Sequence, residues 1–415
     1  MVYQPPLGAR DLLPLDVNQK IWIERRLQQV FHRWGYHRII TSTLERLDTL
    51  TAGGAVQPST VIQLQDSDEV GLGLRPEFTA SIARATVTRM LDSQGWPQRL
   101  YYNGNIFRKQ HTTAYGAQLE FYQAGIELLG ADGLLADSEI LLLLLECLQT
   151  LGLTDCHLIV GEAGLTRSLL SSFPAEQREL VRRAIAHLDR ISLEQLPLSN
   201  ELKELALFLF DLRGKPEDVL AKVAQLALDE QQQKIVNHLK SLMDLLRQYW
   251  SVHPEAALTQ TTEPGIVLDL SLIQTFDYYT GIVFTAVSSN DSGSRILGKG
   301  GRYDQLLGLY HPQGKTEAGI GFAVNIEDLH HVLLQTSQLP KQTPASDWLV
   351  VPQTDQAAAA AFSYAQTLRE SNHLLRVEIE LNTSDPETVR DLARRRRIQQ
   401  IAWVDTEGSP RIETI

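Results

Sequence analysis

Two stretches of sequence, YYNGNIFR at residues 101–108 and EFYQAGIE at residues 120–127, decide the fold. Both are rich in aromatic residues and contain isoleucine, which favours extended strands, and the polar segment KQHTTAYGAQ separates them. This pattern predicts two strands, over 99–107 and 120–127, joined by a loop. In the second strand Gln123, Gly125 and Glu127 occupy alternate positions, which would place them on one face.

Helices and strands continue outward from this pair. An apolar stripe (Ile23, Leu27, Val30) ending before Gly35 predicts an N-terminal helix. The same patterns predict further helices over 77–90, 136–151 and 325–336 and strands over 37–44, 61–64, 72–74, 156–160, 265–270, 278–287 and 318–324. We expect the strands at 265–270 and 278–287 to form a pair, and residues 298–301 (GKGG) to form a tight loop.

Changes in composition divide the chain. Residues 165–262 are rich in Leu, Glu, Gln, Lys and Arg with Gly214 as the single glycine, which predicts an all-helical insertion into a core of residues 1–334. Residues 335–345 are polar and contain proline, as linkers do. Residues 346–415 alternate predicted strands and helices, which is typical of a small α/β domain with a mostly parallel sheet.

The overall composition excludes several classes of protein. The 415 residues carry a formal net charge of -12, which argues against a general nucleic-acid binder and makes tRNA binding unexpected. Charged residues interrupt the most apolar stretch, 134–153, so we expect no membrane span. Only two cysteines are present and the N-terminus has no signal-peptide pattern, so we expect a cytoplasmic protein without a structural metal.

Several segments, taken in order, resemble the class II histidyl-tRNA synthetases. They are LGARDLLP (7–14), GLRPEFTA (73–80), the strand pair quoted above, LIQTFDYYTGIVF (272–284), GGRYD (300–304) and AGIGFAVNIEDL (318–329). The resemblance implies an α+β fold in which an antiparallel sheet is flanked by helices, and a homodimeric unit.

The resemblance also implies a histidine pocket, whose residues are Glu77, Thr79, Gln123, Glu127, Tyr278, Tyr279 and Tyr303. These residue types suit the ligand, because histidine carries an ammonium group that needs acceptors and an imidazole that needs two polar partners. Simpler interpretations stay open for single residues. Glu77 follows Arg-Pro and suits the first turn of a helix, and GGRYD suits a turn with glycine at positive φ.

The sequence differs from the synthetases at residues that would bind ATP. Arg108 retains the arginine of motif 2, but Gln274 and Asp328 stand where the synthetases have arginines. Adenylation of histidine needs preorganised cations on the phosphates, and loss of one such donor typically costs about 10²–10³ in rate. Asp328 would even bring a negative charge to the position of the ATP tail. We therefore expect no catalytic residues and no aminoacylation.

This combination resembles the ATP phosphoribosyltransferase regulatory subunits, the synthetase-like proteins of histidine biosynthesis. The resemblance implies a short catalytic subunit as partner, homodimeric units within a hetero-oligomer, histidine as the feedback effector and no cofactor. The catalytic partner joins ATP to phosphoribosyl pyrophosphate, and the regulatory chain is required for its activity. Two alternatives stay open: a divergent but active histidyl-tRNA synthetase, and a synthetase paralogue that acts on another target.

Overall fold

The computed structural model divides into two compact units, Met1–Leu339 and Pro340–Ile415, each of which is described by itself. It describes residues 5–54, 56–64, 71–90, 95–109, 118–153, 155–253, 265–272, 278–290, 293–382 and 385–415. Among the described residues, no helix combines the length and the apolar character needed to cross a membrane.

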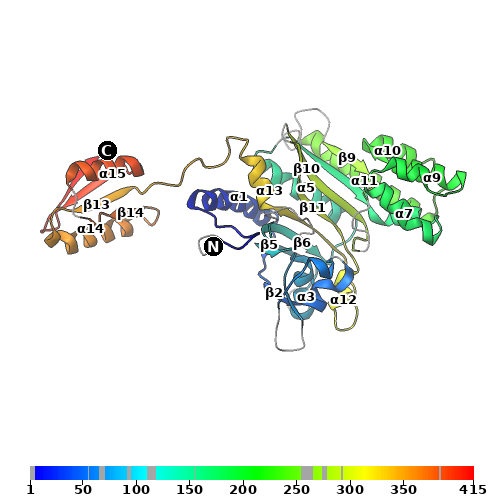
Figure 1. Ribbon diagram of the computed structural model, residues 1–415, viewed down its shortest axis with the longest axis horizontal. Helices are drawn as coiled ribbons and strands as arrows, with labels where there is room; N and C mark the ends of the chain where they lie inside the picture. The colour runs from blue at the N-terminus through cyan, green and yellow to red at the C-terminus, as the bar shows by residue number, and fades with distance from the viewer. Residues whose placement is uncertain are drawn as a thin grey trace. The chain divides into compact units, whose positions relative to one another are not determined.

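A nine-stranded sheet forms the centre of the first unit (Figure 1). In spatial order its strands are β1 (His37–Arg38), β5 (Gln98–Phe107), β6 (Glu120–Leu129), β12 (Gly319–Asn325), β11 (Gly293–Arg302), β10 (Ile282–Asn290), β7 (Cys156–Glu162), β9 (Ile266–Asp269) and β8 (Arg213–Gly214). Neighbours pair antiparallel, apart from the parallel pairs β1–β5 and β7–β9. The α+β fold with an antiparallel-rich sheet, and the strand pair at its centre, are therefore confirmed.

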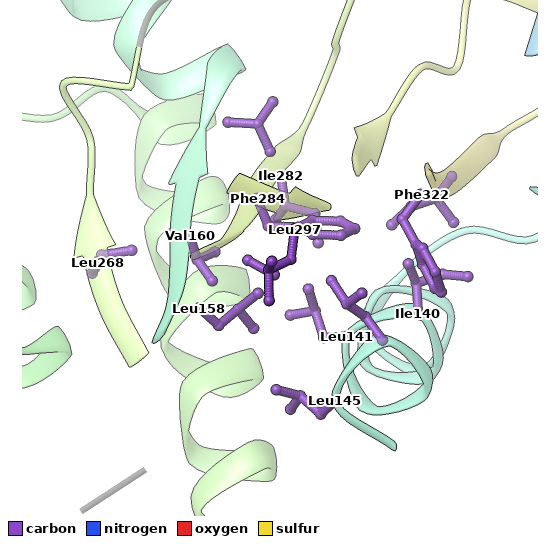
Figure 2. Close-up of a cluster of buried hydrophobic side chains, with 14 of the residues drawn as sticks. Ile140, Leu141, Leu145, Leu158, Val160, Leu268, Ile282, Phe284, Leu297 and Phe322 are labelled. Carbon is purple, nitrogen blue, oxygen red and sulfur yellow. The ribbon is translucent and has the colours of Figure 1, made fainter. Parts of the chain in front are cut away.

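Helices cover one face of this sheet and bury its apolar side chains. The helices α1 (Pro14–Arg33), α5 (Leu134–Thr150) and α13 (Ile326–Leu333) pack on β6, β11 and β12. Figure 2 shows the contact, with Ile140, Leu141 and Leu145 of α5 facing Phe284 and Leu297 of the sheet. All five side chains are nearly inaccessible to solvent, so this layer anchors the strands that carry the site.

The opposite face carries a smaller layer. There α3 (Thr79–Arg89) and α12 (Leu306–Tyr310) pack together beside β5 and below the sheet in Figure 1. A three-stranded antiparallel sheet, β2 (Leu44–Arg46), β4 (Leu72–Leu74) and β3 (Ile62–Leu64), lies next to the short helix α2 (Leu47–Thr51). The predicted hairpin of 61–64 with 72–74 is confirmed. The predicted strand 37–44 is wrong as one element, because β1 and β2 belong to different sheets.

The helical insertion consists of α6 (Ala163–Leu170), α7 (Ala175–Ala186), α8 (Arg190–Gln195), α9 (Asn200–Phe210), α10 (Pro216–Val223) and α11 (Glu230–Val252). It is drawn in green beside the β9 edge of the sheet in Figure 1. The expectation that this region is entirely helical is wrong, because β8 adds an edge strand to β9. The predicted end of the insertion, residue 262, lies outside the described part of the chain.

Two further strand predictions are wrong because pairing depends on tertiary contacts. The expected partners β9 and β10 do not pair with each other but lie on either side of β7. Residues 298–301 do not form a loop: they lie within β11 and pair with β10 and β12. None of these glycines has a positive φ, and a side chain at Gly301 would meet the ring of Tyr279 at 2.7 Å. The glycines therefore permit close packing rather than a turn.

The second unit is a small α/β domain with a four-stranded sheet. Its sheet order is β14 (Val377–Ile379), β13 (Trp348–Pro352), β15 (Gln400–Val404) and β16 (Pro410–Thr414), with helices α14 (Ala358–Ser371) and α15 (Pro386–Arg396). The pairs of β13 are parallel, as expected, and the antiparallel strand β16 was not predicted. Asp385 caps α15, its side chain accepting the backbone N–H groups of Glu387 and Thr388.

Candidate functional site

A cavity of about 600 Å³ lies on the face of the sheet opposite α5. Much of its floor is formed by small residues that face one another across three strands. Gly301 of β11 lies opposite Gly321 of β12, and Gly321 lies opposite Glu127 of β6. In the adjacent row, Ala323 lies opposite Gly125. Because alternate residues of a strand share a face, these positions together leave a depression in the sheet.

The floor glycines are needed for space. A Cβ atom at Gly321 would overlap the carboxylate of Glu127 and the carbonyl oxygen of Ile126. At Gly301 the added atom would come within 2.7 Å of both the Tyr279 ring and the carbonyl oxygen of Ile282. The sequence thus places glycine where a buried carboxylate and an aromatic ring approach the backbone.

The structure brings all the predicted pocket residues to this one cavity. Its lining includes Glu77, Thr79, Gln123, Glu127, Tyr278, Tyr279 and Tyr303. The retained Arg108 and the substituted Asp328 line the same cavity. Gln274 lies outside the described residues.

Glu127 is the deepest polar group of the cavity. Its side chain is 1% exposed and accepts hydrogen bonds from the hydroxyl of Thr79, at 2.7 Å, and from the phenol of Tyr303. Burial, with a smaller contribution from the charge of Glu77, raises its pKa from 4.5 to about 8, although the two hydrogen bonds oppose this change. The carboxyl group is therefore mainly neutral at pH 7 and can both donate and accept a hydrogen bond.

Aromatic rings enclose this carboxyl group. Tyr278 stacks on Tyr303, with ring centroids 5.3 Å apart, and meets Tyr279 edge to face at 4.8 Å. Tyr102 stacks on Phe78 at 4.3 Å. Burial raises the pKa of each of the tyrosines well above 10, so the phenols stay neutral. The inner end of the cavity thus offers flat apolar surfaces with neutral polar tips.

Glu77 lies two residues before the start of α3, the helix that borders the cavity. Its carboxylate accepts the backbone N–H groups of Thr79, at 2.6 Å, and of Ala80, at 2.9 Å, in the first turn of α3. The simple interpretation as a helix-terminal acid is therefore correct, and the same side chain also lines the cavity. Nearby, the side-chain oxygen of Gln123 is buried and has no hydrogen-bond partner among the described residues. Both groups can accept hydrogen bonds from a ligand.

The outer part of the cavity carries the cations Arg108 and Lys299. The Nε atom of Arg108 donates to the carbonyl oxygen of Pro76 at 2.7 Å, which holds the guanidinium at the end of β5. Sequence analysis did not single out Lys299, because it assigned residues 298–301 to a loop. The sequence signal that could have revealed Lys299 was the alternation of lysine with glycine, which is compatible with a strand.

Asp328 lies at the cavity with partners of its own. Its carboxylate pairs with the guanidinium of Arg295 at 2.8 Å and accepts from the side-chain amide of Asn325 at 2.7 Å. Its negative charge is therefore compensated within the chain. Neither partner was identified from the sequence, because Arg295 and Asn325 lie on the adjacent strands β11 and β12.

A buried ion pair supports the segment that carries Tyr303. The guanidinium of Arg302 contacts the carboxylate of Asp137 in α5 at 2.6 Å and that of Asp304 at 3.1 Å. Asp137 also meets His238 of α11 at 2.8 Å, which raises the pKa of the imidazole. Arg302 and Asp137 are 5% and 2% exposed, so the core provides each charge with a partner.

Comparisons with known proteins agree with this geometry. Residues 8–329 match the histidyl-tRNA synthetase family. The solved structure of an ATP phosphoribosyltransferase regulatory subunit/histidyl-tRNA synthetase from Bacillus halodurans superposes with a TM-score of 0.79 at 24% identity, covering 98% of this chain and 99% of that chain. Histidyl-tRNA synthetase from Nostoc sp. PCC 7120 superposes with a TM-score of 0.76 at 20% identity, covering 99% and 97%. At these identities the likeness shows the fold.

Sequence similarity separates the two kinds of protein that share this fold. The chain is 61% identical to the ATP phosphoribosyltransferase regulatory subunit of Nostoc sp. strain PCC 7120 and 60% identical to that of Nostoc punctiforme, with all of each chain covered. The same strain thus supplies a regulatory subunit at 61% identity and a histidyl-tRNA synthetase at 20%. This chain belongs to the family of ATP phosphoribosyltransferase regulatory subunits, which is built on the fold of class II histidyl-tRNA synthetases.

Proposed function

We propose that this regulatory subunit binds L-histidine in the cavity beside Glu127 and transmits its presence to a catalytic ATP phosphoribosyltransferase subunit. The observation that carries the proposal is the buried carboxyl group of Glu127, held by Thr79 and Tyr303 within an aromatic enclosure. Such a coupling between two sites typically amounts to about 1–3 kcal/mol. The catalytic subunit would join ATP to phosphoribosyl pyrophosphate, and histidine would reduce that activity.

The inner end of the cavity suits an imidazole. The neutral carboxyl group of Glu127 can donate a hydrogen bond to the unprotonated ring nitrogen, and the tyrosine rings that line the cavity provide flat surfaces. An ionised carboxylate would suit a cation better than a neutral ring, so the raised pKa of Glu127 favours imidazole at this position.

The ammonium group of histidine would lie nearer to Glu77 and Gln123. The carboxylate of Glu77 already accepts two backbone N–H groups but has about four lone-pair positions, so it retains capacity for the ligand. The buried oxygen of Gln123 lacks a partner among the described residues, and an ammonium N–H would satisfy it.

The outer part of the cavity argues against adenylation. Asp328, which stands where an active synthetase has arginine, is neutralised by Arg295 and supplies no cation for a phosphate. The sequence has Gln274 where an active synthetase has arginine. We therefore propose that the chain binds the amino acid without activating it, and that tRNA, which the net charge of -12 disfavours, is not a ligand.

We further propose that the chain forms homodimeric units within a hetero-oligomer with the catalytic subunit, in the cytoplasm. This part of the proposal follows from the family resemblance. The function must therefore be tested on the assembled complex, because histidine would reduce the activity of the catalytic subunit there.

The decisive experiment is reconstitution with the catalytic subunit from the same organism. Phosphoribosyl-ATP formation is measured with and without this chain, each over a titration of histidine. The proposal expects activity that depends on this chain and falls with histidine. An unchanged activity would contradict it, and ATP–pyrophosphate exchange by the chain alone would instead support the active-synthetase alternative.

A further inference from the structure

Lys299 occupies an unusual position for a lysine, on the floor of the cavity in the middle of the sheet. It lies between Thr285 of β10 and Ala323 of β12, and Ala323 in turn lies opposite Gly125 of β6. Small side chains therefore border Lys299 on the β12 side, which leaves its long side chain room in the cavity.

The alternation of β11 settles which face Lys299 occupies. A Cβ atom at Gly300 would meet the ring of Phe284, which belongs to the core shown in Figure 2. A Cβ atom at Gly301 would meet the ring of Tyr279, which lines the cavity. Because Lys299 and Gly301 are two residues apart in a strand, Lys299 lies on the face of the cavity and not of the core.

No acidic side chain of the described residues forms an ion pair with Lys299. The cavity partly removes the ammonium group of Lys299 from water, which lowers its pKa. The positive charge of Arg108 lies close enough to lower this pKa as well. Two like charges at one end of a cavity, one without an ion-pair partner in the described residues, favour an anionic ligand.

We propose that Lys299, together with Arg108, binds the α-carboxylate of the amino acid in the cavity. This inference rests on the proposed function, which assigns partners to the imidazole and the ammonium group of histidine. It extends that function by assigning partners to the carboxylate. A free amino acid has a cationic and an anionic end. The acceptors Glu77 and Gln123 match the cationic end, and the pair of cations matches the anionic end.

The assignment also defines the ligand class. A carboxylate held by an ammonium and a guanidinium forms charge-assisted hydrogen bonds, which are about twice as strong as neutral ones. An amine with an imidazole but no carboxylate, such as histamine, would lack these bonds. The cavity would then select the free amino acid over its decarboxylated or amidated forms.

The test compares histidine with histamine and L-histidinamide by isothermal titration calorimetry on the full-length chain. For Lys299→Gln we expect about tenfold weaker binding of histidine and binding of histamine within about twofold of the wild type. Lys299→Arg keeps the positive charge and is expected to retain most of the histidine affinity. Lys315→Gln removes an exposed lysine that does not line the cavity and should bind all the ligands as the wild type does.

Each outcome has a defined meaning. Equal losses for histidine and histamine in Lys299→Gln would assign a structural role to the lysine and overturn the proposal, as would no loss for either ligand. Binding of inorganic phosphate that disappears in Lys299→Gln, with histidine affinity unchanged, would assign the cations to a phosphate site instead. If the wild-type chain bound no histidine, the proposed function itself would fail, and that result is distinguishable from all of these.

Discussion

Replacing Glu127 by glutamine removes the titrating group at the bottom of the cavity while keeping the size of the side chain. The amide can accept from Thr79 and donate to Tyr303, so it imitates the neutral form of the carboxyl group. The wild-type protein and the Glu127→Gln variant should therefore differ mainly in how their stability depends on pH.

The magnitude follows from the raised pKa. Because one pKa unit corresponds to about 1.4 kcal/mol, moving the pKa of Glu127 from 4.5 to about 8 corresponds to about 5 kcal/mol. The folded state binds this proton more tightly than the unfolded state. Its contribution to the free energy of unfolding is therefore fully present below the unfolded-state pKa and is lost as pH rises through the folded-state pKa.

The glutamine variant has no proton to lose at this position. The free energy of unfolding of Glu127→Gln, relative to the wild type, should therefore increase by about 3–4 kcal/mol between about pH 5 and about pH 8. Urea unfolding of the ligand-free full-length proteins, followed by far-UV circular dichroism across this pH range, measures the difference.

A matched control replaces an exposed carboxylate. Glu194 forms a surface pair with Arg190 at 3.0 Å, and Glu194→Gln should unfold with a pH dependence parallel to that of the wild type. Parallel curves for Glu127→Gln as well would refute the reasoning, because they would mean that Glu127 titrates alike in the folded and unfolded chain.

The remaining predictions concern binding, packing and the missing synthetase activity. Glu127→Ala should raise the histidine concentration for half-inhibition of the reconstituted complex at least about tenfold, and unchanged inhibition would count against a role for this residue. Gly321→Ala forces an added methyl group against buried atoms and should lower the free energy of unfolding by about 1–3 kcal/mol, measured from urea midpoints. Asp137→Ala leaves the guanidinium of Arg302 buried without its closest partner and should cost about 3–5 kcal/mol, to be checked by thermal unfolding at constant pH. Gln274→Arg alone should not produce ATP–pyrophosphate exchange, and measurable exchange in that variant would refute the account of the lost activity.

The sequence predicted correctly those helices and strands whose pattern repeats within one segment. The apolar stripe of the first helix and the stop at Gly35 match α1, which ends at Arg33, and Gly35 has a φ of +78°. The aromatic strands at 99–107 and 120–127 match β5 and β6 to within two residues. In each case the signal is repeated along a single segment, so no partner from elsewhere in the chain is needed to recognise it.

Patterns that depend on a distant partner misled the prediction. The glycine-rich segment 298–301 was assigned to a loop, although it lies in β11. Its glycines make room for the side chains of Phe284 in β10 and of Tyr279 before β10. The error also hid Lys299, whose orientation follows only once the strand is recognised. In the same way, nothing local to Asp328 in the sequence reveals that its carboxylate pairs with Arg295.

The sequence by itself determined the family, the order of most elements and the residue types of the pocket, because each of these is contained in short segments. Only the tertiary structure decided that the pocket residues from Glu77 to Tyr303 surround one cavity. It also decided that Glu127 is buried and neutral and that Asp328 is paired. The physical reason is that burial, protonation and ion pairing depend on distances between segments far apart in the chain, and those distances arise from the packing of the sheet.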